Sequence, residues 1–176
     1  MHVKEVGQMG TMSKHVLIRP ARVADATAVA DVYLASRKRF LPYAPLAHGD
    51  EEVRRWIAEY LIPEAEVSVA VMEGAVVGMM ALTRDEAAGW IDHLYLHPSA
   101  TGRGIGTRFV AEAKMRLDPP IRLYTFQAND GARRFYERHG FQAIAFGDGS
   151  NNEERYPDVL YEWRPGESFQ PAEPRE

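Results

Sequence analysis

The 176-residue sequence predicts one mixed α/β domain built around a single central sheet. Runs rich in Val, Ile, Leu and Tyr, typical of strands, alternate with amphipathic stretches of helical period along the chain. In the middle, three strand-like runs follow one another, and Glu73-Gly74 between the first two has the composition of a tight hairpin turn. A chain of this length fits one domain, because domains usually run to about 100–200 residues.

Proline and capping residues set the boundaries of the predicted elements. Pro20 ends the first strand, and Asp25 begins the first helix. Asp50 caps the second helix, and Pro63 stops it. The predicted strands cover 16–19, 66–72, 75–83, 89–97, 121–126, 141–146 and 159–163. The predicted helices cover 25–40, 51–61, 104–116 and 129–138, which gives the order β-α-α-β-β-β-α-β-α-β-β.

We expect the domain to span residues 15–164. Residues 1–14 read as an N-terminal extension or leader that is disordered, and they lack the continuous apolar core of a secretory signal. Met9 or Met12 is an alternative first residue. Residues 165–176 are rich in Pro and Glu, and we expect a disordered tail there.

Composition excludes several classes of protein. The sequence has no cysteine, which excludes a disulfide scaffold, a thiolate metal site and a cysteine nucleophile. The net charge is -4 with acidic and basic residues interspersed, so we expect no nucleic-acid partner. No run approaches the roughly 18 apolar residues that a membrane span needs. We therefore expect a cytoplasmic protein without a membrane partner.

The first candidate site is the glycine-rich stretch Pro98–Gly106. It lacks the lysine of a P-loop, and its spacing is G-x-G-x-G instead of the Rossmann G-x-G-x-x-G. Glycines at 102, 104 and 106 would let successive backbone amides converge at the start of a helix, where the helix dipole favours an anion. The other interpretation is a plain glycine-rich turn between a strand and a helix.

The second candidate site is the segment Asn129–Phe141. Asn129 suits a helix N-cap, and Tyr136 lies two turns later near the same face, with the small Ala132 between them. A tyrosine hydroxyl in that position could protonate a departing thiolate. The alternative is that Tyr136 is a core aromatic and that Gly140 only ends the helix.

Together, the two segments resemble the GNAT superfamily of acyl-coenzyme A-dependent N-acyltransferases, over roughly Val16 to Trp163. Gly102–Gly106 resembles the end of the family's Q/R-x-x-G-x-G/A loop, and Asn129–Phe141 matches its N-x-x-A-x-x-F-Y-x-x-x-G-F segment. The resemblance implies a mixed, mostly antiparallel central sheet flanked by helices, with acetyl-CoA as co-substrate and no metal. One position departs from the pattern, since Thr101 stands where the family usually has Gln or Arg.

The resemblance also implies roles for individual residues. The amides of Leu94 and Leu96 would hold the pantetheine arm and polarise the thioester carbonyl, and Tyr136 would be the general acid. The implied coenzyme-binding set is Leu94, Tyr95, Leu96, Thr101, Gly102, Arg103, Gly104, Ile105, Gly106, Thr107, Asn129 and Arg133.

The residue that deprotonates the amine is less clearly marked. If strand alternation holds, Asp92 shares a face with Leu94 and Leu96, which makes it the candidate base. Asp92 could instead fix a neighbouring loop or bind the substrate cation. A water molecule could also take the proton of the amine. His93 and His97 would lie about 13 Å apart on a strand, too far to share a metal ion.

The acceptor region is predicted to lie in residues 39–52 and 147–158. The second range holds Glu153, Glu154 and Asp158, which would suit a cationic amine, although we favour a solvated acidic loop. We expect an N-acetyltransferase for the primary amine of a small molecule, with a homodimer as an option. The alternatives are acetylation of a protein N-terminus or lysine, and a non-catalytic acyl-CoA-binding regulatory module.

Overall fold

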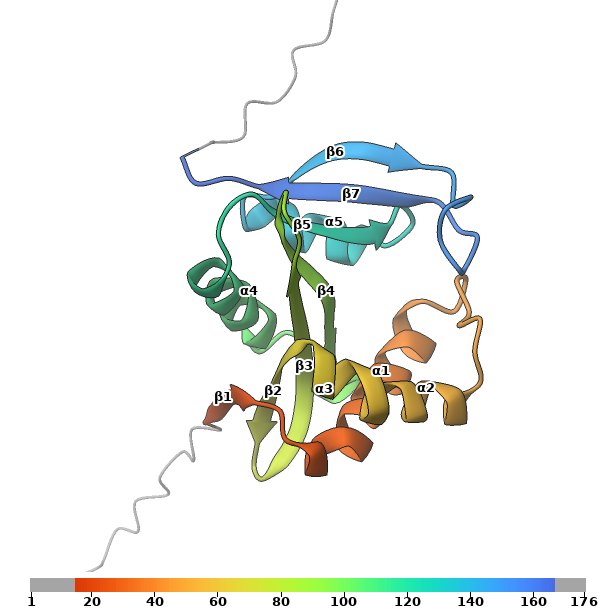
Figure 1. Cartoon of the computed structure of the whole chain (residues 1–176), viewed down its shortest axis with the longest axis vertical. Helices are drawn as coiled ribbons and strands as arrows, with labels where there is room; N and C mark the ends of the chain where they lie inside the picture. Colours follow the sequence, from red (N-terminus) through yellow and green to blue (C-terminus); the bar gives the residue numbers. More distant parts are fainter. Residues whose placement is uncertain (1–14, 167–176) are drawn as a thin grey trace, which may run out of the picture.

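A computed structural model describes residues 15–166, which form a seven-stranded sheet with helices on both faces (Figure 1). The predicted leader at 1–14 and nearly all of the predicted tail lie outside the described residues. The strands are β1 (Val16–Pro20), β2 (Glu66–Met72), β3 (Ala75–Arg84), β4 (Gly89–Leu96), β5 (Ile121–Phe126), β6 (Gln142–Gly147) and β7 (Asp158–Trp163). The helices are η1 (Val23–Asp25), α1 (Ala26–Phe40), α2 (Asp50–Trp56), η2 (Ile57–Leu61), α3 (Ile62–Glu64), η3 (Pro98–Ala100), α4 (Ile105–Arg116) and α5 (Asp130–Arg138).

The strand order is β1-β2-β3-β4-β5-β7-β6, and every neighbouring pair is antiparallel except β4 with β5. A crossover through α4 joins these two parallel strands, as parallel pairing requires. The predicted mixed, mostly antiparallel sheet flanked by helices is confirmed.

The sheet splits between β4 and β5. These strands pair only at Gly89 with Ile121 and at Trp90 with Arg122, and beyond those residues they diverge (Figure 1). On its other edge, β5 pairs with β7 over its full length from Ile121 to Phe126. The divergence leaves the second half of β4 with a free edge, which is where ligands can reach the middle of the sheet.

Two hydrophobic cores cover the two faces of the sheet. One core packs α4 and α5 against the sheet and contains the fully buried Phe109, Phe141 and Tyr161. The other packs α1 and the α2–η2 helix on the opposite face, around Val29 and Ile57. Within residues 15–166, no helix has the length and apolar character needed to cross a membrane.

The second predicted helix continues past the residue that was expected to end it. A wider π turn over Ile57–Leu61 precedes Pro63, and the amide of Ile62 bonds to the carbonyl of Ile57, five residues back. The α-helical path resumes in α3, whose first turn contains Pro63, and the Ala65 amide bonds to the Leu61 carbonyl at 3.0 Å. Pro63 has no N–H to donate, and it lies where the regular α-helical hydrogen bonds are already interrupted by the π turn.

Candidate active site

The free half of β4 contains a β-bulge at Asp92. Ala81 of β3 pairs with His93 while the next residue, Leu82, pairs with Ile91, so Asp92 is the extra residue. The bulge interrupts the strict strand alternation on which the predicted placement of Asp92 relies, so alternation alone no longer determines the face of Asp92. Asp92 is nonetheless exposed and lines a cavity together with Leu94.

The glycine-rich loop follows η3 and leads into α4. Gly102 and Gly104 have φ values of +72° and +76°, in the left-handed region that favours glycine, and open space lies where their Cβ atoms would be. The first-turn amides of α4 have no acceptor within the helix, and the helix dipole is positive at that end. Gly106 has a different role, because its Cβ would lie 3.1 Å from the Phe135 ring of α5.

Asn129 caps α5 as predicted. Its Oδ1 accepts a hydrogen bond from the Ala132 amide at 3.1 Å. Tyr136, further along α5, is buried and packs against Phe135 and Phe141 at ring distances of 5.1 Å and 5.7 Å. Burial, with a smaller contribution from Tyr95, raises the pKa of Tyr136 well above its usual range, so the hydroxyl keeps its proton at neutral pH.

Two cavities meet at the split between β4 and β5. The glycine-loop cavity has a volume of about 830 Å³, and among the predicted coenzyme-binding residues it is lined by Leu94, Tyr95, Leu96, Thr101, Gly102, Gly104, Ile105, Gly106, Thr107 and Asn129. The aromatic cavity has a volume of about 530 Å³, and its aromatic lining residues are Tyr33, His93, Tyr95, Tyr124, Phe126, Tyr136 and Phe146. Both predicted catalytic residues, Asp92 and Tyr136, line the aromatic cavity. The two cavities share Leu41, Leu94, Tyr95, Asn129 and Ala132.

The glycine-loop cavity fits a long ligand with an anionic end. It runs from the shared residues at the strand split to the amides at the start of α4, where a phosphate would find donors and a favourable dipole. The Thr101 hydroxyl donates to the Pro98 carbonyl at 3.1 Å, so this side chain stabilises the turn. Arg138 also lines the cavity from α5, and the sequence analysis did not select it.

Two predicted coenzyme-binding arginines do not line either cavity. Arg103 is exposed. The Nε of Arg133 donates to the Tyr161 hydroxyl and one of its terminal nitrogens donates to the Gln127 carbonyl, both at 3.2 Å. Arg133 thereby fastens α5 to β7, which is a structural task.

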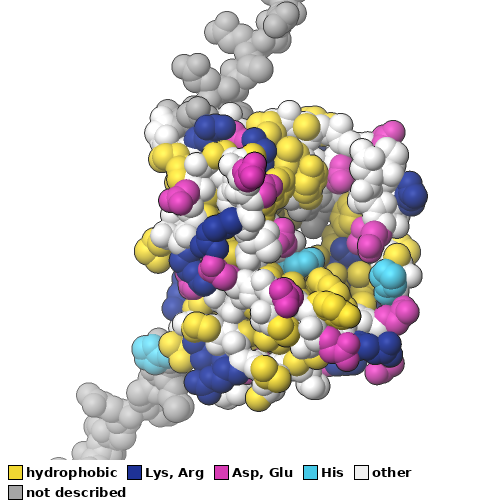
Figure 2. Space-filling model, viewed as in Figure 1, with side chains coloured by type: hydrophobic (Ala, Val, Ile, Leu, Met, Phe, Trp, Pro, Cys, Tyr) yellow, Lys and Arg dark blue, Asp and Glu magenta, His cyan; other side chains and the backbone are white. Residues whose placement is uncertain are grey.

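The aromatic cavity is a hollow in the surface with hydrophobic and acidic side chains around it (Figure 2). On one side it is closed by a bridge between residues 37–48, which lead from α1 to α2, and residues 148–157, which join β6 to β7. We call these contacts the strap. In the strap, a terminal nitrogen of Arg37 donates to Glu154 at 2.7 Å and to the Ala44 carbonyl at 3.1 Å. The rings of Tyr43 and Tyr156 lie 5.1 Å apart.

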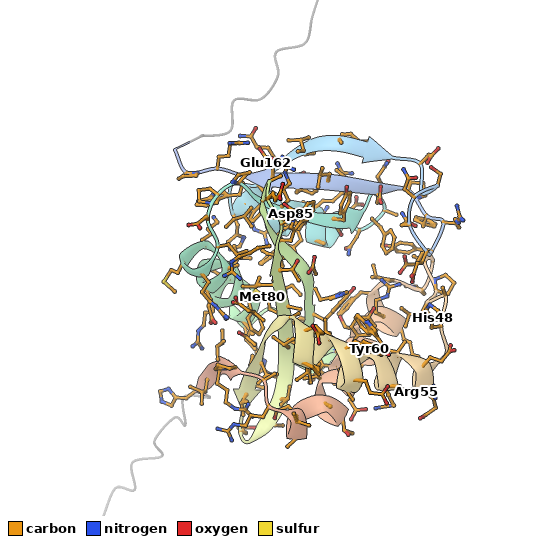
Figure 3. The ribbon with its side chains drawn as sticks, viewed as in Figure 1. His48, Arg55, Tyr60, Met80, Asp85 and Glu162 are labelled. Carbon is orange, nitrogen blue, oxygen red and sulfur yellow. The ribbon has the colours of Figure 1, made fainter. Side chains whose placement is uncertain are left out.

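The strap corrects the interpretation of the late loop as a solvated acidic segment. Glu154 is largely enclosed and paired with the buried Arg37, and only its neighbour Glu153 extends into solvent. His48, labelled in Figure 3, lies at the edge of the strap with its Nε2 3.7 Å from a Glu153 oxygen. The local sequence did not reveal the pair, because 117 positions separate Arg37 from Glu154. Arg37 lies at the same four-residue spacing as the buried Val29 and Tyr33. A charged residue at a buried position of the helix was the sequence signal that could have indicated a buried ion pair.

His93 is enclosed by aromatic rings at the wall of the aromatic cavity. Tyr33, Trp56 and Tyr95 lie 5.8 Å, 5.4 Å and 6.1 Å from its ring centre. Burial lowers the pKa of His93 to about 4, and the positive charge of Arg37 adds to the effect while Asp92 opposes it. The imidazole is therefore neutral at pH 7. Over the part of the chain that the structure describes, no three His, Asp or Glu residues are grouped to hold a metal ion.

The sequence profile of the Acetyltransferase (GNAT) family matches residues 33–141, a range that contains the bulged strand, the glycine-rich loop and α5. The chain belongs to the GNAT acetyltransferase family. It is accordingly an acyltransferase whose acetyl donor is acetyl-CoA. No match was found among curated protein sequences.

Several solved structures share the fold. YjaB from Escherichia coli superposes with a TM-score of 0.68 at 22% identity, over 85% of this chain and 97% of its own. PaiA N-acetyltransferase from Thermoplasma acidophilum, solved in complex with coenzyme A, gives 0.68 at 20% identity, over 85% and 99%. Ard1 from Thermoplasma volcanium gives 0.63 at 18% identity, over 83% and 95%. These likenesses extend over nearly all of each relative.

Proposed function

We propose that this GNAT protein moves the acetyl group of acetyl-CoA to the primary amine of a small molecule, by direct attack while both substrates are bound. The observation that carries the proposal is the meeting of two cavities at Leu94, Tyr95, Asn129 and Ala132. One cavity suits a coenzyme, and the other suits an acceptor. The sequence has no cysteine to carry an acyl-thioenzyme, which favours direct attack.

In this proposal, acetyl-CoA supplies the activated acyl group and the protein supplies position and proton transfer. The amide of Leu94, on the free half of β4, donates to the carbonyl oxygen and stabilises the charge that develops there. Gly102, Gly104 and the first-turn amides of α4 hold the pyrophosphate. The Tyr136 hydroxyl, which is protonated at neutral pH, gives its proton to the departing thiolate.

Two features support a small acceptor and a carboxylate base. The strap closes one side of the aromatic cavity, where a protein chain acting as acceptor would need an open groove. Asp92 is exposed and lines that cavity beside Leu94, so it can accept the proton of the amine directly or through water.

The deciding experiment is acetyl-CoA-dependent thiol release against a panel of amines, with wild type and Tyr136→Phe compared. We expect the variant to bind acetyl-CoA normally and to lose about 100-fold or more in kcat, since positioned proton transfer contributes about 10²–10⁴-fold. Tyr60→Phe, at an exposed tyrosine of η2 outside both cavities, is the matched control.

An unchanged kcat in Tyr136→Phe would remove this tyrosine from the proton transfer. Acetyl-CoA binding without thiol release for any amine would instead favour a non-catalytic acyl-CoA-binding module.

A further inference from the structure

Building on the proposed function, we infer that the acceptor is a cationic amine that carries an aromatic body and no carboxylate. Its ammonium group would lie at Asp92, and its ring would lie against the exposed aromatic side chains Tyr124 and Phe146. The inference rests on two independent features of the aromatic cavity, its charge and its rim.

The cavity has an excess of negative charge. Its charged lining residues are three carboxylates, Asp92, Glu154 and Asp158, and one guanidinium, Arg37. Glu154 already pairs with Arg37 at 2.7 Å, and an oxygen of Asp158 accepts from the Asn152 amide at 2.9 Å. Asp92 is the exposed carboxylate of the three, and it lies two residues before Leu94, which both cavities share. An ammonium group is complementary to this arrangement.

Arg37 does not provide a carboxylate site. Its side chain is only 6% exposed, and one terminal nitrogen serves both Glu154 and the Ala44 carbonyl. Its Nε is shielded from solvent and has no hydrogen-bond partner among the described residues, so an incoming ligand cannot reach it without displacing the strap. The guanidinium also lies 5.6 Å from the centre of the Phe126 ring. A carboxylate on the acceptor would therefore meet three carboxylates and one guanidinium that is already paired with Glu154.

The rim of the cavity is aromatic and unusually exposed. Tyr124 of β5 and Phe146 of β6 are 59% and 61% exposed, and both line the cavity. The Tyr124 ring is stacked on Trp90 at 5.9 Å with 10° between the ring planes, and the Trp90 Nε1 is held by Asp85 at 2.7 Å. This stack fixes a flat apolar surface at the opening.

Phe146 is fixed in a similar way. The guanidinium of Arg133 lies 5.9 Å from the centre of its ring and is itself held by the Tyr161 hydroxyl and the Gln127 carbonyl. Aromatic rings in contact with a flat apolar ligand add specific stabilisation beyond the area that they bury. Two fixed, exposed rings beside an acidic cavity therefore select a ligand with a cation at one end and a ring at the other.

The test compares four amines on the full protein. Their Kd values are measured by calorimetry on protein saturated with coenzyme A. In a separate experiment, their kcat/KM values are measured by thiol release from acetyl-CoA. The probes are 2-phenylethylamine, phenylalanine, n-hexylamine and spermidine. We expect 2-phenylethylamine to bind at least about tenfold tighter than phenylalanine, because the added carboxylate meets like charge. We expect it to bind about three- to tenfold tighter than n-hexylamine, because the ring contacts are lost.

Variants assign the two halves of the ligand. Asp92→Asn should weaken binding of 2-phenylethylamine and n-hexylamine alike, whereas Tyr124→Ala and Phe146→Ala should weaken only the aromatic amine. Tyr60→Ala, at a tyrosine that is 60% exposed on η2, and Asp118→Asn, at an exposed carboxylate before β5, are controls that should change neither Kd. Figure 3 shows Tyr60 on the helical segment in the lower half of the view, whereas β6 and β7 lie at the top.

Tighter binding of phenylalanine or spermidine, equal binding of n-hexylamine, or no binding of any probe would overturn the inference. The preferred binding order without thiol release would support the inferred ligand class and contradict the proposed transferase. Thiol release that is equally efficient with all four amines would support the transferase and overturn the ligand class.

Discussion

Burial shifts the pKa values of two residues that line the aromatic cavity in opposite directions. It disfavours the charged form of any group, so it raises the pKa of Tyr136 and lowers the pKa of His93 to about 4. At neutral pH both side chains are uncharged, and Tyr136 has a proton to give. His93 is enclosed by aromatic rings, whereas the proposed base Asp92 is exposed and lines the cavity beside Leu94, so access and position favour Asp92.

The desolvation of His93 makes the stability of the protein depend on pH. Below about pH 6.5 the unfolded chain binds a proton at this histidine that the folded protein takes up only near pH 4. The contribution of the neutral His93 to the free energy of unfolding is therefore lost as pH falls from about 6.5 to about 4. The loss is at most about 1.4 kcal/mol per pH unit. We expect His93→Gln to flatten the pH dependence of the free energy of unfolding in this window, measured by urea titration.

The same titration on His15→Gln, at an exposed histidine before β1, separates this effect from that of a surface histidine. A wild-type curve parallel to that of His93→Gln between pH 6.5 and 4.5 would show that His93 titrates normally in the folded protein.

At the scale of elements, the β6–β7 loop depends on one close backbone approach. Gly149 has a φ of +90°, and a Cβ atom at this position would lie 2.6 Å from the backbone of Tyr156. Backbone atoms cannot shift aside as a flexible side chain can. The turn at Gly149 therefore helps to position Glu154 for its pair with Arg37 and Tyr156 for its ring contact with Tyr43.

Gly149→Ala should destabilise the protein by roughly 2–4 kcal/mol, from left-handed strain plus the clash with backbone. Gly74→Ala is a matched control, because Gly74 has a φ of +80° and open space around its Cβ position. It should cost about 1 kcal/mol from strain alone. Denaturant unfolding measures both, and equal losses in the two variants would contradict the close approach. We also expect Gly149→Ala to raise KM for the amine more than KM for acetyl-CoA, since the loop lines only the aromatic cavity.

At the scale of the whole molecule, the strap reconnects two halves that the split sheet separates. β1 to β4 with α1 and α2 lie on one side of the split, and β5, β7 and β6 lie on the other (Figure 1). The Arg37–Glu154 pair crosses between them beside the aromatic cavity, with side-chain exposures of 6% and 18%. Removing one member of such an enclosed pair leaves an unpaired charge, which costs more than the pair itself contributes.

Glu154→Ala should lower the free energy of unfolding by roughly 2–3 kcal/mol, somewhat below the value for fully buried pairs because Glu154 keeps some contact with solvent. Glu153→Ala, at the neighbouring exposed carboxylate, should stay within about 0.5 kcal/mol of wild type. In the double variant with Arg37→Met, much of the loss should be recovered, because the unpaired charge is gone. Additive losses in this double-mutant cycle would mean that the pair does not hold the strap.

Much of the fold followed from short-range patterns. The Asn129 cap, the Glu73-Gly74 hairpin turn and the helix that begins after Gly104 depend on residues within a few positions of one another. Local periodicity also determined the order of strands and helices, including the crossover between β4 and β5. The glycine loop and α5 were recognisable for the same reason, because each is one continuous segment with its own capping and turn residues.

Only the tertiary structure decided how these segments form a site. The bulge at Asp92 arises from pairing with β3, and the sheet splits where β4 and β5 stop pairing beyond Trp90 and Arg122, while β5 stays paired with β7 on its other edge. The local pattern could not separate the loop residues that line the cavity from Arg103 and Arg133, which do not. Arg37 and Glu154 become partners only through folding, since their contact depends on long-range packing. The sequence by itself determined the family and the coenzyme loop, whereas packing between distant segments determined the shape and charge of the second cavity.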